Sequence, residues 1–150
     1  MAPNHEVLIG DEGGHHVVIR ALSRNHPTLF DHRDGNWVGC ELQIAAGGFR
    51  AAFRADLRSE EFQAFLVEAE VLNSALDGVA SFSTIEEQIA LSLVGNGRGQ
   101  VRVQGVALDA PGSDNRLHFS FDIDQTDLPQ ICRSLESLLA AFPVVGVADA

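Results

Sequence analysis

The chain has 150 residues, of which 45% are hydrophobic and 21% charged, and its formal net charge is −11. This length favours one domain, and a domain of this size buries about 68–70% of its unfolded surface, so a core without disulfides or metal is expected. The longest nearly apolar stretch, Leu138–Ala148, is too short to span a membrane. Because carboxylates repel phosphate groups, the acidity argues against nucleic-acid and membrane partners and favours a basic partner.

The first residues lack the basic and apolar regions of a secretion signal, so we expect a cytoplasmic protein. The two cysteines, Cys40 and Cys132, fall at core-like positions of a predicted strand and a predicted helix. In a reducing compartment we expect them to be small buried thiols and not a disulfide.

The N-terminal part shows the two-residue period of half-buried strands. Glu6–Ile9 and His16–Leu22 are predicted to form a hairpin, and Ser23–Asn36, rich in Asn, Pro, His and Asp, is predicted to be a loop. Trp37–Ile44 and Phe49–Leu57 alternate in the same way and are joined by a short glycine-rich connection, which predicts a second hairpin.

A helical period follows this hairpin. Ser59 is the predicted N-cap, Glu60 and Glu61 occupy the first turn, and the helix is expected to stop at Asp77–Gly78. The residues of its core stripe are Phe62, Phe65, Leu66, Ala69, Leu72 and Leu76.

Four more alternating segments come next: Val79–Thr84, Gln88–Val94, Gln100–Asp109 and Arg116–Ile123. In the third of them the apolar residues change parity at Gly105, which predicts a β-bulge there. The turns between these segments are typical of antiparallel neighbours.

A second helical stripe starts after Thr126–Asp127 and ends at Pro143. Its apolar residues are Leu128, Ile131, Cys132, Leu135, Leu138, Leu139 and Phe142. The resulting order, ββββα followed by ββββα, predicts the α+β class: a mainly antiparallel sheet with two amphipathic helices covering its apolar faces. We expect one domain over residues 1–150, with 144–150 as a frayed or lightly docked tail.

Four short motifs follow one another along the chain: Asp34–Val38 (DGNWV), Ala46–Phe49 (AGGF), Leu76–Ala80 (LDGVA) and Asp124–Leu128 (DQTDL). In this order they resemble the WapI-family immunity proteins, over about Asp31–Pro143. The resemblance implies that the protein neutralises a cognate bacterial contact-delivered toxin by binding it, without turnover. The first thirty residues lie outside the resemblance.

Enzyme chemistry finds little support in the sequence. No Gly-x-Ser-x-Gly motif is present, and no His pair has the helical spacing that places two imidazoles on one metal ion. Gly95–Gly99 is glycine-rich, but a predicted strand follows it where a phosphate-binding loop needs a helix. We therefore expect no catalytic residue, no metal and no cofactor.

The first predicted helix carries the candidate site. With successive residues about 100° apart, Ala64, Val67 and Val71 gather on the side opposite the core stripe, and glutamates flank them. An apolar patch rimmed by carboxylates suits a basic, partly hydrophobic partner such as a toxin domain. The predicted partner-binding residues are Glu60, Glu61, Ala64, Val67, Glu68, Glu70 and Val71.

Two alternatives remain open at this stage. The chain could be a small-ligand-binding or enzymatic domain whose anion pocket lies on the solvent side of the sheet, around Arg50, Arg54, Arg102 and His118. The helix face could instead be covered by the N-terminal hairpin, or by a second copy of the chain in a homodimer.

Overall fold

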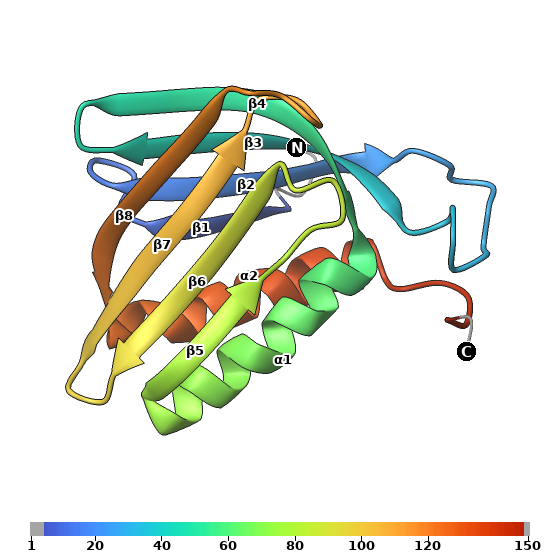
Figure 1. Ribbon diagram of the computed structural model, residues 1–150. Helices are drawn as coiled ribbons and strands as arrows, with labels where there is room; N and C mark the ends of the chain where they lie inside the picture. The colour runs from blue at the N-terminus through green and yellow to red at the C-terminus, as the bar shows by residue number, and fades with distance from the viewer. Residues whose placement is uncertain (1–4, 149–150) are drawn as a thin grey trace.

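The computed structural model describes residues 5–148 and divides the strands between two antiparallel sheets of four (Figure 1). The first sheet contains, in spatial order, β1 (Glu6–Gly10), β2 (His16–Arg24), β3 (Trp37–Ala46) and β4 (Phe49–Arg58). The second contains β5 (Asp77–Phe82), β6 (Ile89–Asn96), β7 (Gln100–Leu108) and β8 (Arg116–Asp124). Helix α1 (Ser59–Ala75) follows the first sheet, and a 3-10 turn, η1 (Gln125–Asp127), leads from the second into α2 (Leu128–Ala141).

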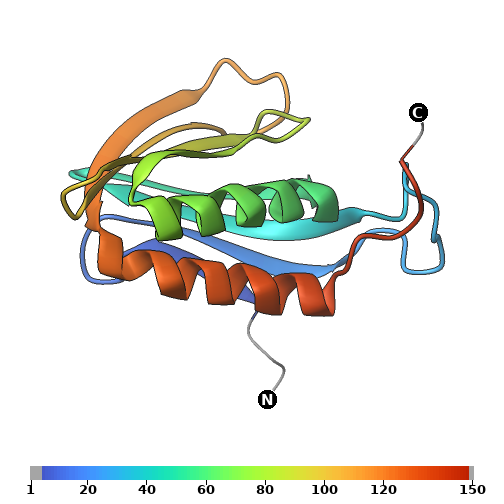
Figure 2. The ribbon, with the colours of Figure 1, turned by 90° about the horizontal axis from the view of Figure 1, so that it is seen from below.

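The two helices lie side by side beneath the sheets, as Figure 2 shows. Helix α1 packs along β5 and against α2, and α2 packs along β1. This arrangement confirms the predicted α+β class and the order ββββα-ββββα.

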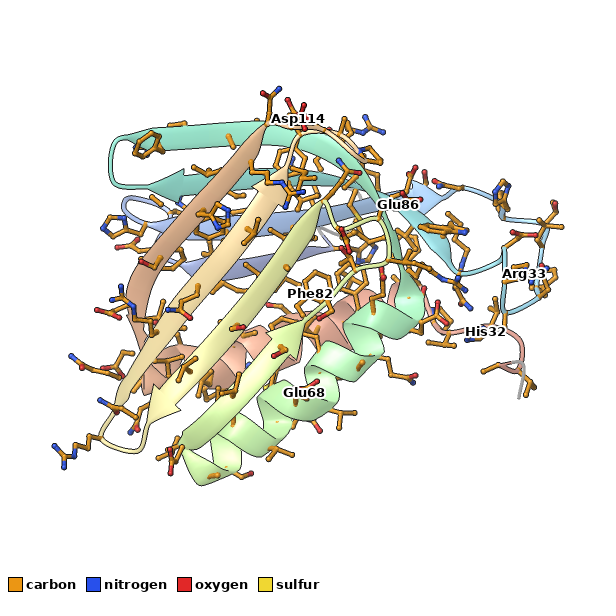
Figure 3. The ribbon with its side chains drawn as sticks, viewed as in Figure 1. His32, Arg33, Glu68, Phe82, Glu86 and Asp114 are labelled. Atoms are coloured by element: carbon orange, nitrogen blue, oxygen red, sulfur yellow. The ribbon has the colours of Figure 1, made fainter. Side chains whose placement is uncertain are left out.

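Aromatic rings fill the space between α1 and the second sheet. The rings of Phe62 and Phe65 lie 5.4 and 5.2 Å from that of Phe82 on β5, and all three side chains are at most 1% exposed (Figure 3). Burying a phenylalanine stabilises a fold by about 1.5–3 kcal/mol, so this contact fixes α1 against β5 and leaves the opposite side of α1 in solvent.

One buried amide ties the two sheets together. Gln88, 2% exposed, donates through Nε2 to the carbonyl oxygen of Arg54 on β4 at 3.1 Å and to that of Leu108 on β7 at 3.4 Å. A buried amide without partners would be costly, so these two bonds specify how β4 lies against the second sheet.

Two local predictions are wrong. The register of β7 with both neighbours continues through Gly105 without a bulge, and Val106 projects from the outer face of the sheet. Gly105 is required for a different reason: a Cβ at this position would lie 2.2 Å from the ring of Phe119. Ser59 is the first helical residue of α1 and not its cap; Arg58 holds the N-cap position, and its backbone N–H donates to Glu61 at 2.8 Å.

Both cysteines are free and buried, as predicted. Burial, helped by the nearby Asp56 carboxylate, raises the pKa of the Cys40 thiol to about 12. Burial also raises the pKa of the Cys132 thiol. Neither thiol therefore resembles the reactive, low-pKa cysteines of redox and catalytic sites.

The loop between β2 and β3, residues 25–36, projects from one end of the molecule, and residues 143–148 lie beside it (Figure 1 and Figure 2). Asn36, 0% exposed, joins the two segments: its Nδ2 donates to the carbonyl oxygen of Val145, and its Oδ1 accepts from the N–H of Val145 at 2.8 Å. The segment after α2 is thus docked on the loop through Val145.

Candidate functional site

The exposed side of α1 carries a group of apolar side chains, Ala64, Val67 and Val71, which we call the valine face. Val67 is 57% and Val71 64% exposed, and Ala64 is exposed as well. Large apolar side chains this exposed are unfavourable in water when they gather on one face, so such a patch is a candidate contact surface. The N-terminal hairpin does not cover it, which leaves a partner or a second copy as the remaining occupants.

Two of the flanking glutamates are held by the protein itself at the start of α1. Glu60 pairs with the Arg58 guanidinium and with Nε2 of His32 at 2.5 Å. Glu61 accepts from the backbone N–H groups of Arg58 and Ile85, at 2.8 and 2.6 Å, and burial raises the pKa of its carboxyl above the usual value. Both carboxylates therefore fix the helix N-terminus as well as adding negative charge beside the valine face.

Glu68 and Glu70 lie on opposite sides of the valine face. Glu68 faces β5 and accepts a hydrogen bond of 3.2 Å from the N–H of Ser81, a backbone group on the open edge of that strand (Figure 3). Glu70 lies on the α2 side, close enough for its charge to raise the pKa of Cys132. Glu70 is exposed, and no hydrogen bond or ion pair is recorded for it within residues 5–148.

The charges of α1 are all of one sign. The helix carries four glutamates and no Lys, Arg or His, in its last turn or elsewhere. A second acidic region, to which α1 does not contribute, lines a hollow of about 700 Å³ between the β1–β2 turn, β8 and η1. Its acidic lining residues are Asp11, Glu12, Asp122, Asp124 and Asp127. Each of the two regions presents a negative potential to a basic surface.

The alternative anion pocket does not form. Arg50 and Arg54 lie on β4 of the first sheet, whereas Arg102 and His118 lie on β7 and β8 of the second, and the sheets share no ladder. Arg102 is paired with Asp122 at 3.3 Å. β7 and β8 are neighbours, but β4 pairs with neither of them, so the condition that the sequence interpretation required for all four side chains is not met.

The outer face of the second sheet has a shallow hollow of a different kind. The strand register brings three serines and a glutamine into one row, at Ser81, Ser92, Gln104 and Ser120. Together with Val106 and His118 they line a shallow hollow of about 540 Å³. Its lining contains no Asp, Glu, Lys or Arg, and within residues 5–148 no hydrogen bond joins His118 to a serine of the hollow, as a nucleophile beside a base would require.

Residues 5–148 hold neither a cluster of metal-binding side chains nor a membrane-spanning helix. No group of three or more His, Cys, Asp and Glu side chains is placed to hold a metal ion. No helix in this part of the chain is long and apolar enough to cross a membrane.

The sequence interpretation overlooked the loop that adjoins α1. Phe30 at its tip is 72% and the neighbouring Leu29 41% exposed, and the loop reaches α1 through the His32–Glu60 pair. The one available signal was the apolar pair Leu29-Phe30 within an otherwise polar segment. The contacts that hold the loop come from distant parts of the chain, which no local pattern reveals.

The fold also occurs in solved structures. The trypanosoma bruciei MRP1/MRP2 crystal structure contains a chain that matches with a TM-score of 0.51 and 11% identity, covering 94% of this chain and 86% of that one. A guideRNA-binding protein complex bound to a gRNA matches with a TM-score of 0.49 and 12% identity, covering 93% of this chain and 91% of that one. At these identities the first likeness shows the fold alone. A search among curated proteins found no significant match.

The chain is thus a small two-sheet α+β domain whose first helix exposes an acidic, partly apolar face. Residues 7–143 match the immunity protein WapI-like family, so the chain belongs to this family. The match confirms the resemblance and starts earlier than expected, because it includes the first hairpin. Membership of a family of immunity proteins points to a toxin-neutralising role.

Proposed function

We propose that the protein is a non-enzymatic immunity protein of the cytoplasm, which binds a cognate basic toxin domain through the valine face of α1 and blocks it by occlusion. The observation that carries this proposal is the exposure of Val67 and Val71 in a chain of the WapI-like family. The predicted contact residues are those of the sequence interpretation, with Val67 and Val71 at the centre.

The chemistry of the surface supports the proposal. Interfaces bury an apolar centre and keep polar groups at the rim, and Val67 and Val71 lie between the carboxylates of Glu68 and Glu70. The valines supply desolvated contact area, while the carboxylates accelerate the encounter with a basic surface and disfavour acidic competitors. A nuclease toxin fits this description, because it needs a basic surface to hold phosphate groups. The net charge of −11 opposes direct binding of nucleic acid by the immunity protein itself.

The test is a survival assay with a binding assay beside it. The first step is to read the frames next to this chain's gene. A large secreted protein encoded there supplies the probe, its C-terminal domain expressed in the cytoplasm of a sensitive host. We expect the wild-type chain to restore growth and to form a complex with the domain, and the V67E/V71E variant to do neither. Continued killing in the presence of folded wild-type chain would overturn the immunity function.

The same preparations test the homodimer alternative. A wild-type chain that elutes as a dimer in size-exclusion chromatography, and that becomes a monomer in the V67E/V71E variant, would show that the valine face is covered by a second copy. A monomer in both cases leaves the face free for the toxin domain, as the proposal requires.

A further inference from the structure

The loop between β2 and β3 presents an aromatic side chain to solvent at its tip. Phe30 is 72% exposed, Leu29 beside it is 41% exposed, and Val147 of the segment docked on the loop is 87% exposed. A phenylalanine in this position loses contact with the core of its own domain. Aromatic side chains are enriched at the centres of protein interfaces, where they fill pockets of the partner.

The backbone around Phe30 is tightly folded. The loop turns back on itself at Gly35, where a Cβ would lie 2.7 Å from the carbonyl oxygens of both Leu29 and Asp31, the residues on either side of Phe30. The N–H of Gly35 donates to the carbonyl oxygen of Asp31 at 2.9 Å. The two residues that flank Phe30 are therefore held by direct contacts with Gly35.

Two side chains from strands, Arg24 of β2 and Arg58 of β4, and the loop's own Asn36 hold the base of the loop. Arg24 donates to the carbonyl oxygens of Gly35 and Pro143, and Arg58 donates to that of His32. Asn36, buried completely, donates to the carbonyl oxygen of His32 at 2.9 Å and makes its two bonds to Val145. A loop that is ordered before binding loses less conformational entropy in the complex, which favours affinity.

The loop contacts the N-terminal end of α1, and the valine face begins on the same helix at Ala64, in its second turn. The backbone N–H of Ser59, the first residue of α1, donates to the carbonyl oxygen of Asn36 at 3.0 Å, and Glu60 pairs with His32. Figure 3 places His32 and Arg33 on this loop beside the start of α1. A partner seated on the valine face near the helix N-terminus is therefore within reach of the loop.

The charges near the tip indicate the kind of partner. Asp31 and Asp34 are both exposed, with Arg33 between them, and Glu60 lies at the junction with α1. At the tip the two aspartates outnumber the single arginine, whereas Glu60 at the base is paired with Arg58 and His32. An apolar pocket with a basic rim, on a protein partner, complements this surface.

We infer that Phe30 is an anchor residue of the toxin contact: it enters an apolar, basic-rimmed pocket of the toxin domain, and Asn36 is the residue that positions it. This inference rests on the proposed function and extends its site from the valine face to the loop. It also makes Phe30 a residue that determines which toxin domain is recognised, because a pocket must exist to receive the ring.

The experiment compares Phe30→Ala with Phe49→Ala against the same toxin domain used for the survival assay. Phe49 is a matched control: it is 68% exposed and lies on the β3–β4 hairpin, at the opposite end of the molecule from the loop (Figure 1 and Figure 2). We expect Phe30→Ala to raise the Kd by about tenfold or more and Phe49→Ala to leave it within about twofold, with both variants unfolding near the wild-type urea midpoint.

Asn36→Ala tests the positioning role through a double-mutant cycle. Asn36 is 0% exposed and cannot touch a partner, so an effect on Kd must pass through the loop. If it acts by holding Phe30, Asn36→Ala weakens binding in the wild-type background and has little further effect in the Phe30→Ala background. Additive effects of the two substitutions would contradict the positioning role.

The outcomes separate the inference from the function on which it rests. If the wild-type chain binds the toxin domain and Phe30→Ala binds it equally well, the anchor is wrong and the immunity function stands. If the wild-type chain neither binds nor neutralises the domain, both are wrong. Loss of binding in Phe30→Ala together with unchanged binding in Phe49→Ala supports the inference.

Discussion

Replacing both valines of α1 by glutamate, V67E/V71E, tests whether the valine face is a contact surface for a partner or part of the protein's own packing. The two side chains are 57% and 64% exposed, so little packing is lost. Three new pairs of carboxylates then lie one helical turn apart: position 67 with Glu70, position 67 with position 71, and position 71 with Glu68. Each such like-charge pair costs about 0.2–0.5 kcal/mol. Glutamate is the better helix former by a few tenths of a kcal/mol, so we expect a net loss of about 1 kcal/mol.

The assay is urea unfolding followed by far-UV circular dichroism, with Phe65→Ala as the reference for a core change. Phe65 is 1% exposed and packs on Phe82, so its truncation should cost about 3–5 kcal/mol. Binding of the toxin domain by the double glutamate variant should weaken by at least about tenfold, because hydrated charges then occupy the centre of the interface. V67Q/V71Q, similar in size but uncharged, should bind with intermediate affinity.

Two results would refute this reasoning. A V67E/V71E variant that unfolds as easily as Phe65→Ala would show that the face is internal to the native protein. A variant that is folded, monomeric and still binds the toxin domain with wild-type affinity would place the interface elsewhere on the molecule.

Three further predictions concern the thiols, the charge and the acid stability. Cys40 and Cys132 are buried, so a thiol reagent should label them only after denaturation, and rapid labelling of the native protein would contradict their placement. The association rate with the toxin domain should fall by about tenfold or more between low salt and 0.15 M, where the Debye length is about 8 Å; a rate independent of salt would exclude charge steering. The backbone N–H of Thr126 holds the pKa of Asp124 below its ordinary value of 3.8, so this carboxylate contributes stability above that value and loses it as the pH falls through the lowered pKa. In Asp124→Asn, which keeps a capping oxygen that does not titrate, the urea midpoint should fall less steeply on acidification, and an unchanged acid dependence would contradict the cap.

Local patterns predicted most of the fold because the alternation of apolar residues is a local property. Trp37–Ala46 buries its apolar parity, as the two-residue period indicated, whereas Phe49–Arg58 buries it fully only at Ala55 and Leu57 and leaves Phe49 68% exposed. The division of the strands between two sheets could not be predicted from local patterns. Gln88 specifies how the sheets meet through bonds to Arg54 and Leu108, which are far away in the sequence. Gly105 was misinterpreted for the same reason: the ring that requires a glycine there belongs to Phe119 on the next strand.

Of the candidate site, too, only the part that depends on a local pattern could be predicted. Helical periodicity places Val67 and Val71 away from Phe62 and Phe65, and both valines are exposed in the structure. The loop that carries Phe30 was not identified as a surface, because its order depends on Asn36 bonding to Val145, 109 residues later. Periodicity can find one face of one helix, whereas a rigid loop is the product of contacts between distant segments.

The central claim, neutralisation by stoichiometric occlusion, is tested most directly by titrating a fixed concentration of purified toxin domain, well above the Kd, with the wild-type chain and measuring the remaining toxin activity. Occlusion predicts a linear fall to zero with an equivalence point at one chain per toxin domain, unchanged by longer incubation. Loss of toxin activity at far lower ratios, progressing with time, would show that the chain inactivates the toxin catalytically and would contradict the account.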